Sequence, residues 1–294
     1  MPSLRESIII RSDTAKAVII EKQEFVYVKA CYSGVAAQGD NDKKISKENK
    51  EAIQEAKKQG CHVVITTGRP VSGVLPVLEE LGLTSREDYA IIYNGAKVFN
   101  AETKEIVFSS TIDGKAVKGL YREAQRLKVN FHAFRKNEEL ITPKHNPYTD
   151  VESRLNHIPD TLYNFDELKD NDEFLKAMMV DSDENITRII PFVDKYFTEN
   201  YSMVRSSKIF LEFLNKNTHK GHALEALASY LGIDMKETMA IGDAGNDLPM
   251  ILCAGLGVAM ENSFPEIRQQ ADVITSSNLE SGVAKAIRDY VLTK

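Results

Sequence analysis

The sequence predicts an α/β protein in which a parallel sheet core is interrupted by an inserted α+β domain. Strand-like and helix-like segments alternate from residue 46 onward, as they do in a parallel sheet with helices on both faces. The alternation stops near residue 108, where charge increases and the strands begin to alternate apolar with polar residues. It resumes near residue 212. We therefore expect a core made of residues 28–107 and 212–294, an insert made of residues 108–211, and an atypical N-terminal extension, residues 1–27.

Helix signals and two apolar strands define the first half of the core. Ser46 can cap a helix over KENKEAIQEAKKQ, and Gly60 can end it in the left-handed conformation. The segments HVVIT (62–66) and YAIIY (89–93) are nearly all apolar, which is typical of buried parallel strands. Between them, VSGVLPVLEELG has helical spacing and ends at Gly82.

The insert and the second half of the core follow from the same patterns. In the insert, strands are expected at FHAF (131–134) and KAMMV (176–180), and amphipathic helices at GKAVKGLYREAQRLK and ENITRIIPFVDKYFTEN. In the second half, a helix over GHALEALASYLG precedes the strand-like TMAIGD, LGVAM and ADVIT. A last helix is expected near GVAKAIRDYVL.

Composition narrows the classes of function. With 43% hydrophobic and 27% charged residues in 294, the chain has the composition of a soluble globular protein, which excludes a disordered chain, a collagen and a disulfide scaffold. The net charge of −6 and the lack of a basic block argue against a nucleic-acid partner. Cys31, Cys61 and Cys253 are odd in number and far apart, as expected of reduced cysteines in a cytoplasmic protein. We found no apolar run of about 18 residues and no signal peptide, so we expect no membrane partner.

Two carboxylates follow the strand-like TMAI segment. Asp243 and Asp247 stand four residues apart in IGDAGND, with Asn246 between them. Open α/β sheets bind ligands at the carboxyl ends of their strands, so both acids would line that crevice. Mg²⁺ prefers oxygen ligands and keeps several waters, so one or two carboxylates suffice to hold it. A turn in which an aspartate caps the next helix has the same composition, and the motif alone leaves both interpretations open.

Two other segments at strand ends could bind a phosphate group. Thr67 and the backbone amides of Gly68 and Arg69 follow the 62–66 strand, at the expected start of a helix. Lys220 opens a helix after FLEFL (210–214), and its point charge suits phosphate or clustered carboxylates. A helix cap and a surface lysine are the respective alternatives.

Taken together and in this order, the motifs resemble the Cof-type sugar-phosphatase branch of the haloacid dehalogenase superfamily. The resemblance runs from about Lys43 to the C-terminus. It is carried by TTGRP (66–70), YNGA (93–96), FLKAMMV (174–180), FLEFL with KG (210–221), AIGDAGNDLPMI (240–251), GLGVAM with Asn262, and TSSNLESGVAKAI (275–287). It implies a Rossmann-like core with an α+β cap inserted between the second and third motifs.

The resemblance also implies an activity and a set of site residues. The activity would be Mg²⁺-dependent hydrolysis of small phosphorylated metabolites such as sugar phosphates through an aspartyl-phosphate. Catalytic roles would fall to Lys220 and Thr67, and the metal to Asp243 and Asp247. The substrate-binding positions would be Thr67, Gly68, Arg69, Asn94, Lys220 and Asn246. Apart from the resemblance, His132, His145 and Tyr148 in the cap are candidate substrate contacts, and a solvated or packing role is the alternative for each.

The sequence departs from the family at the first motif, Asp-x-Asp-Gly-Thr, which supplies the nucleophile and the general acid/base. The corresponding segment is YSGVAAQ (32–38), so the two aspartate positions fall on Gly34 and Ala36. Neither residue can attack phosphorus, and Asp243 and Asp247 cannot replace them because a nucleophile needs in-line placement. Asp40-Asn41-Asp42 would need a six-residue slip of the first strand. As written, the chain is not expected to turn over phosphate esters by this mechanism.

Two explanations of the lost motif remain open. One is a coding accident: a one-base shift in permitted codons for Tyr27–Tyr32 can read Met-Ser-Lys-Leu-Ala-Ile, an opening typical of the family, and codons for Gln23-Glu24 can supply a ribosome-binding sequence. The other is an inactive pseudo-phosphatase that binds a phosphorylated ligand through Thr67 and Lys220. A purely structural protein is disfavoured because the downstream motifs are intact. Resequencing codons 20 to 45 separates the two explanations.

Overall fold

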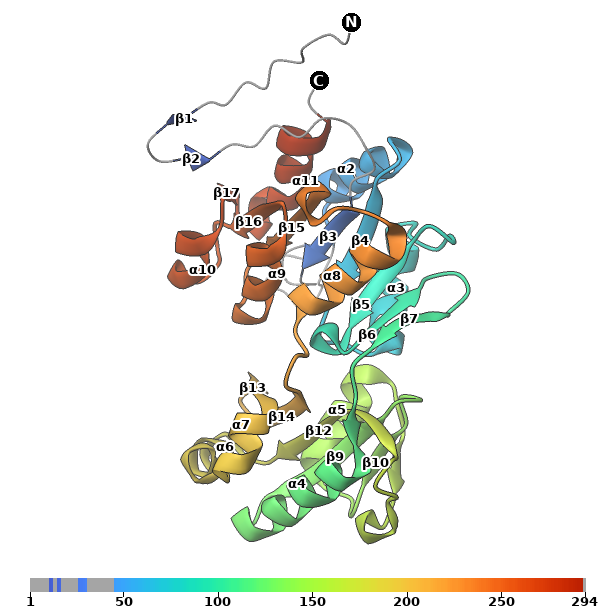
Figure 1. Cartoon of the computed structure of the whole chain (residues 1–294), viewed down its shortest axis with the longest axis vertical. Coiled ribbons are helices and arrows are strands. Elements are labelled where there is room, and N and C mark those ends of the chain that lie inside the picture. Colours follow the sequence, from blue (N-terminus) through green and yellow to red (C-terminus); the bar gives the residue numbers. More distant parts are fainter. Residues whose placement is uncertain (1–10, 13–14, 17–25, 31–44, 293–294) are drawn as a thin grey trace, which may run out of the picture.

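The computed structural model describes residues 11–12, 15–16, 26–30 and 45–292. The chain forms a larger sheet domain, the core, and a smaller one, the cap, which two chain segments connect (Figure 1). This arrangement confirms the predicted α/β fold with an inserted α+β cap. Residues 32–38 with Gly34 and Ala36, Asp40-Asn41-Asp42, Cys31 and most of residues 1–27 lie outside the described residues.

The core is built on one eight-stranded sheet in the order β17-β16-β15-β3-β4-β5-β6-β7. Neighbouring strands from β17 to β5 are parallel, whereas β6 pairs antiparallel with β5 on one side and with β7 on the other. The part of the chain before the cap contributes β3 (Val26–Ala30), α2 (Lys47–Lys58), β4 (His62–Thr66), α3 (Val71–Glu80), β5 (Tyr89–Ile92), β6 (Lys97–Asn100) and β7 (Ile106–Ser109). The part after the cap contributes α8 (Lys220–Leu231), β15 (Thr238–Gly242), α9 (Leu248–Cys253), β16 (Leu256–Met260), α10 (Pro265–Gln270), β17 (Val273–Thr275) and α11 (Gly282–Ile287). A separate antiparallel pair joins β1 (Arg11–Ser12) to β2 (Ala15–Lys16).

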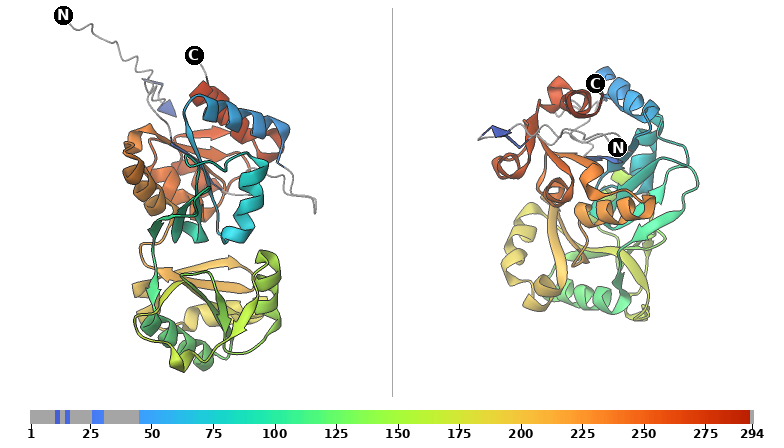
Figure 2. Two further views of the ribbon diagram at one scale, coloured as in Figure 1. Left: turned by 90° about the vertical axis from the view of Figure 1, so that its right-hand side faces the viewer. Right: turned by 45° about the horizontal axis from the view of Figure 1, so that its top comes forward.

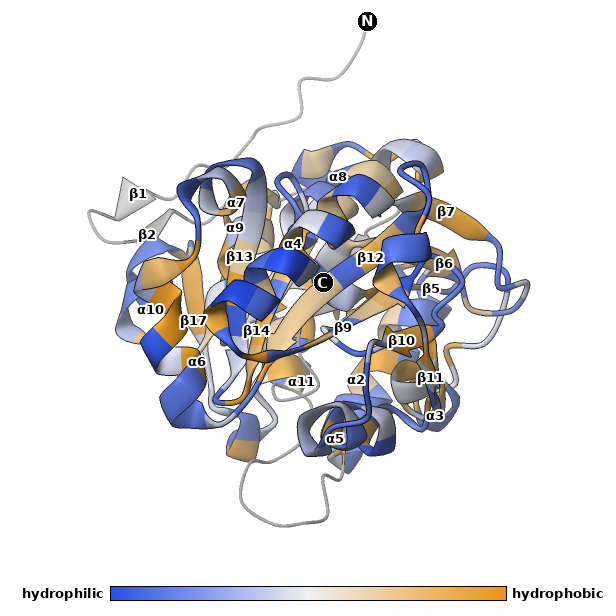
Figure 3. Cartoon of the chain, turned by 90° about the horizontal axis from the view of Figure 1, so that it is seen from below, coloured by the Kyte–Doolittle hydropathy of each residue, from blue (hydrophilic) through white to orange (hydrophobic). Residues whose placement is uncertain are grey.

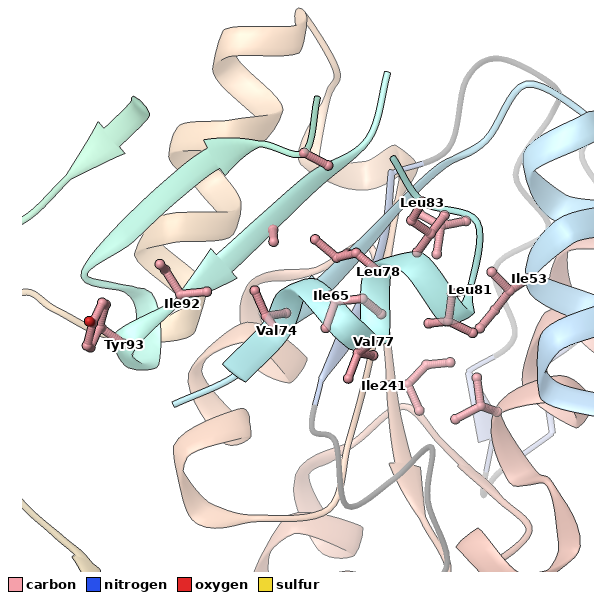
Figure 4. Close-up of a cluster of buried hydrophobic side chains, with 14 of the residues drawn as sticks. Ile53, Ile65, Val74, Val77, Leu78, Leu81, Leu83, Ile92, Tyr93 and Ile241 are labelled. Atoms are coloured by element: carbon pink, nitrogen blue, oxygen red, sulfur yellow. The ribbon is translucent and has the colours of Figure 1, made fainter. Parts of the chain in front are cut away.

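Helices cover both faces of the core sheet, and apolar side chains fill the two layers between. One layer joins α2, α3 and α11 to the sheet through residues such as Ile53, Leu78 and Ile65, which are almost wholly buried (Figure 4). The other layer packs α8 and α9 against the sheet through Leu224, Ala240 and their neighbours. This burial explains why the strands read as continuous apolar runs.

Local signals set the helix boundaries as the sequence predicts. The Ser46 side chain accepts a hydrogen bond from the Asn49 amide and caps α2. Gly60 and Gly82 follow α2 and α3 with φ angles of 87° and 64°. A left-handed residue just past the last turn is a common helix stop, and glycine adopts it at no steric cost.

The cap is a second sheet, with most of its helices on one face and one helix, Pro147–Asn156, against the other face. Its strand order is β11-β10-β9-β12-β14-β13, with β8 paired to β12. Its elements are β8 (Ile112–Asp113), α4 (Gly114–Leu127), β9 (Asn130–Arg135), β10 (Leu140–Thr142), α5 (Pro147–Asn156), β11 (Asp160–Leu162), β12 (Glu173–Val180), α6 (Asp183–Ile189), α7 (Lys195–Asn200), β13 (Tyr201–Ser207) and β14 (Phe210–Asn215). Helix α4 packs on one face of the sheet, and its outward side is hydrophilic (Figure 3).

The other face of the cap sheet is turned toward the core (Figure 2). Phe134, Met178 and Leu214 on this face share one apolar cluster with core residues. The two domains are therefore in apolar contact, and this contact closes the cap over the carboxyl ends of the core strands.

The structure corrects the predicted boundaries and one detail of the sheet. Strand β3 begins at Val26, inside the predicted extension, and the limit between residues 107 and 108 cuts β7, which pairs with β6. The limit between residues 211 and 212 cuts β14, which pairs with β12 and β13 of the cap. The FLEFL segment is as apolar as a core strand and precedes a core helix. For this reason the sequence pattern placed the second boundary too early, inside β14. The sheet is also not wholly parallel, because the chain reverses at Tyr93–Gly95 and returns along β5 as β6.

Candidate active site

A buried ion pair lies at the carboxyl end of β15. Lys220, the first residue of α8, places its Nζ 2.6 Å from Oδ1 of Asp247, and both side chains are fully buried. The other oxygen of Asp247, Oδ2, accepts the backbone N–H groups of Asp243 and Ala244 at 3.0 Å each. Asp247 thus fixes the turn that follows β15 and holds the lysine at its end.

The loop after β4, Thr67–Pro70 (the Thr67 loop), and the turn after β5, Tyr93–Gly95 (the Asn94 turn), are joined by backbone hydrogen bonds. The carbonyl of Thr67 accepts the Asn94 N–H at 3.1 Å, and the carbonyl of Arg69 accepts the Tyr93 N–H at 3.2 Å. Oγ1 of Thr67 accepts the Arg69 N–H at 3.1 Å, so its hydroxyl hydrogen points elsewhere. These bonds set Thr67 and Asn94, both buried, side by side at the ends of adjacent strands.

Two contacts bring these strand ends to the ion pair. Nδ2 of Asn246 donates to Oδ1 of Asn94 at 2.9 Å. Gly95, with a φ of 99°, lies against the start of α8, where a Cβ atom would meet the carbonyl oxygen of His219 at 2.4 Å. The structure therefore brings together Thr67, Gly68, Arg69, Asn94, Lys220, Asn246, Asp243 and Asp247, as the strand-end argument predicts; their roles stay predictions.

Asp243, the first of the two predicted metal ligands, follows β15 directly. Its Oδ2 lies 3.5 Å from Nδ2 of Asn262, whose own Oδ1 accepts the Asn278 N–H at 2.9 Å. Both oxygens of Asp247, the second predicted ligand, accept hydrogen bonds from nitrogen donors, and its role toward a metal stays a prediction. Among the residues that the structure describes, no three His, Cys, Asp or Glu side chains are grouped to hold a metal.

Burial tunes two titratable groups beside Lys220. Desolvation, with a smaller contribution from His222, lowers the pKa of His219, whose ring nitrogen accepts the His222 N–H and caps α8. Burial also raises the pKa of the Cys253 thiol to about 11, so this cysteine stays protonated at neutral pH and is a poor nucleophile. Neither group offers a replacement for the aspartates of the first motif.

The three candidate substrate contacts in the cap lie outside the hydrogen-bond network that joins Thr67, Asn94, Asn246 and Lys220. His132 is fully buried, with its ring nitrogens 2.9 Å from Thr149 Oγ1 and 3.1 Å from Met178 Sδ. His145 lies at the surface beside Asp160, and Tyr148 packs against the apolar cluster. Sequence reasoning missed Glu138, a cap residue that reaches the Thr67 loop; no residue pattern marks it. Asn262 carried a signal, because it follows GLGVAM at the spacing quoted for the family.

The parallel core, the inserted cap and motifs at three strand ends define a hydrolase-like α/β architecture, and comparison with known proteins identifies the family. The model of the haloacid dehalogenase-like hydrolases matches residues 39–287, and the chain belongs to this family. The match begins after Gly34 and Ala36. In the described part of the chain, no helix combines the length and apolar character needed to cross a membrane.

Relatives and solved structures agree with this membership. The Bacillus subtilis protein named "Putative phosphatase YxeH" is 40% identical over 252 residues, which are 85% of this chain and 93% of that protein. The Bacillus subtilis protein named 5-amino-6-(5-phospho-D-ribitylamino)uracil phosphatase YcsE is 30% identical over 254 residues, covering 86% and 91% of the two chains. The crystal structure of a haloacid dehalogenase-like hydrolase from Bacteroides thetaiotaomicron superposes with a TM-score of 0.76 at 27% identity, covering 91% of this chain and 99% of that one.

Proposed function

We propose that this chain carries the phosphoryl-binding half of a cytoplasmic phosphatase for small phosphorylated compounds such as sugar phosphates. The single observation behind the proposal is the contact network at three strand ends, which joins Thr67 to Asn94, Asn94 to Asn246, and the Asn246 turn to Lys220. The phosphatase names of YxeH and YcsE support the reaction class. The net charge of −6 fits a small metabolite better than a nucleic acid.

Each residue of the network has a chemical task in this proposal. The Thr67 hydroxyl, which already accepts the Arg69 N–H, donates its hydrogen to a phosphoryl oxygen. Lys220 offsets the negative charge of the transferring group from a fully buried position, where a charge acts more strongly than in water. Asn94 and Asn246 hold the loops that carry these groups at a fixed separation.

The residues present fit a magnesium ion in part. Carboxylate and amide oxygens are suitable ligands, and Mg²⁺ keeps several waters, so one carboxylate can suffice. We expect Asp243 to supply that oxygen and Asp247 to act through the backbone amides that it accepts. A bound Mg²⁺ would supply charge stabilisation to the phosphoryl oxygens.

The phosphatase reaction also needs a carboxylate that this sequence lacks. In an aspartyl-phosphate mechanism a carboxylate oxygen forms a bond to phosphorus while the ester oxygen leaves and takes a proton; water then cleaves the acyl phosphate. Gly34 and Ala36 can supply neither the nucleophile nor the proton. We therefore expect no turnover of sugar phosphates above background by the chain as written.

The test is a phosphate-release assay on three proteins with Mg²⁺ present. One is the chain as written, the second restores the motif by Gly34→Asp, Ala36→Asp, Ala37→Gly and Gln38→Thr, and the third carries Gly34→Asp alone. Only the full restoration should recover activity, because groups that act as a unit are not additive. Robust turnover by the chain as written would mean that another nucleophile exists, and Asp40 would be the first residue to replace.

A catalytically inactive binder is the second candidate function, and the observation that favours it is the identity of residues 34 and 36. It predicts that the chain as written binds inorganic phosphate, and that Lys220→Met weakens this binding. Resequencing the gene across codons 20 to 45 then decides: an in-frame Asp-x-Asp-Gly-Thr supports the enzyme, and confirmed Gly34 and Ala36 support the binder. Calorimetry with inorganic phosphate checks the binding in either case.

A further inference from the structure

Two residues with unusual backbone conformations meet where the cap touches the core. Tyr93, in the turn after β5, has a φ of 50°, and Glu138, at the tip of the β9–β10 turn in the cap, has a φ of 71°. A side chain with a Cβ atom is disfavoured in this left-handed region, where glycine or asparagine is more usual. Such conformations persist where the surroundings hold them, and they concentrate at functional sites.

The Glu138 carboxylate crosses the domain boundary to three donors of the core. Its Oε1 accepts Nζ of Lys97, and its Oε2 lies 3.2 Å from the Val71 N–H and 3.4 Å from the Tyr93 hydroxyl. The carboxylate is 16% exposed and the Lys97 side chain 8%. Burial, together with Glu138 itself, raises the pKa of Tyr93 well above its usual value, so its hydroxyl stays protonated and donates.

Two of these donors, Val71 and Tyr93, stand beside the Thr67 loop. Val71 is the first residue of α3, directly after Thr67–Pro70, and its N–H has no partner within its own helix. Tyr93 donates its own N–H to Arg69 and is followed by Asn94, the partner of Asn246. One cap carboxylate therefore contacts the end of the Thr67 loop and the start of the Asn94 turn together.

We propose that Glu138 is a positioning residue that fixes the Thr67 loop when the cap is closed. Its carboxylate clamps Val71, Tyr93 and Lys97, so the geometry of the loop depends on the cap being in place. The role toward phosphate rests on the proposed function, whereas the clamp itself does not. Another contact across the boundary, from Ser72 Oγ to the Asn156 carbonyl at 2.6 Å, carries no charge and reaches only α3.

Replacement by glycine separates the clamp from a structural role of the turn. Glu138→Gly relieves the left-handed backbone, so a purely local role predicts an unchanged or more stable protein. The matched control is Glu139→Gly, next in the same turn, whose carboxylate pairs with Arg135 inside the cap at 3.4 Å. Glu138→Gln keeps an acceptor of the same length and should give an intermediate result.

Hydrogen exchange of the full chain is the first measurement. With Glu138→Gly, the Val71 amide should exchange about tenfold faster, because it loses its charged acceptor. The Tyr93 amide, whose acceptor is the Arg69 carbonyl of the loop, should also exchange faster because the loop is no longer fixed. With Glu139→Gly they should exchange as in the parent. Unchanged exchange with Glu138→Gly, or equal acceleration in both variants, would overturn the clamp.

Affinity for inorganic phosphate, measured by calorimetry, is the second measurement. Glu138→Gly should weaken binding about tenfold and Glu139→Gly should leave it unchanged. Faster exchange with unchanged phosphate affinity would refute the positioning role. If the parent itself binds no phosphate, the proposed function fails, and the exchange rates still decide whether the clamp exists.

Discussion

Replacing Lys220 with methionine tests the buried ion pair on which the candidate site is built. Methionine keeps the apolar stem of the lysine and removes its charge, while Asp247 stays in place, fully buried. The backbone N–H groups of Asp243 and Ala244 still bind one oxygen of Asp247, but the ammonium group 2.6 Å from the other is gone. Removing one partner of a buried ion pair costs about 3–5 kcal/mol, so Lys220→Met should lower the free energy of unfolding of the core by that amount.

The assay is urea denaturation of the parent and the variant, with a matched control elsewhere in the chain. Lys118→Met removes a lysine that also lies 2.6 Å from a carboxylate, Asp170, but that carboxylate is 70% exposed. Solvent screens such a pair, so the control should change stability far less. Adding Asp247→Asn to Lys220→Met should recover part of the loss, because the amide keeps an acceptor without the charge. A loss below about 1 kcal/mol for Lys220→Met, or one equal to the control, would refute the reasoning.

Two further predictions concern the cap and the turn after β5. Burial lowers the pKa of His132 to about 3, so between pH 6.5 and pH 3 the unfolded chain takes up a proton that the folded cap does not. This histidine should therefore reduce the stability of the cap by about 1.4 kcal/mol per pH unit as the pH falls below 6.5. Urea denaturation at several pH values should give a shallower slope for His132→Gln than for the parent, with exposed His145→Gln as control; parallel curves would contradict the prediction. Gly95→Ala should destabilise the core by more than about 1 kcal/mol, because the added Cβ meets the His219 carbonyl and φ is 99°. Gly245→Ala, where the Cβ meets nothing within 4 Å, is the matched control in thermal denaturation, and equal shifts in the two variants would count against the argument.

The parts of the fold that could be predicted depend on short segments of sequence. HVVIT and YAIIY are buried on both faces of the sheet, so their apolar runs report their position directly. Asp243, Thr67 and Lys220 follow strands or open helices, and the parallel topology brings such positions to one edge of the sheet. Their convergence could therefore be predicted from the sequence before any interatomic distance was known.

The parts that could not be predicted depend on contacts between distant segments. β14 has the apolar pattern of a core strand, and only its pairing with β12 and β13 assigns it to the cap. Glu138 reads as a surface acid in a charged turn, and its task is visible only once Val71, Tyr93 and Lys97 surround it. The partners of the Asp247 oxygens, Lys220 and two backbone amides, are likewise visible only in the structure.

The way this site is held together bears on how the restored motif should behave. The bonds that fix the Thr67 loop join residues 67–69 to residues 91–94, and those that fix the ion pair join Lys220 to residues 243–247. The hydrogen bond between Asn246 and Asn94 joins the two networks. All of these bonds are made by residues that the restoration leaves unchanged, so we expect the restored chain to keep them. The phosphate-release assay of the two chains side by side then reports what the two carboxylates add to the site.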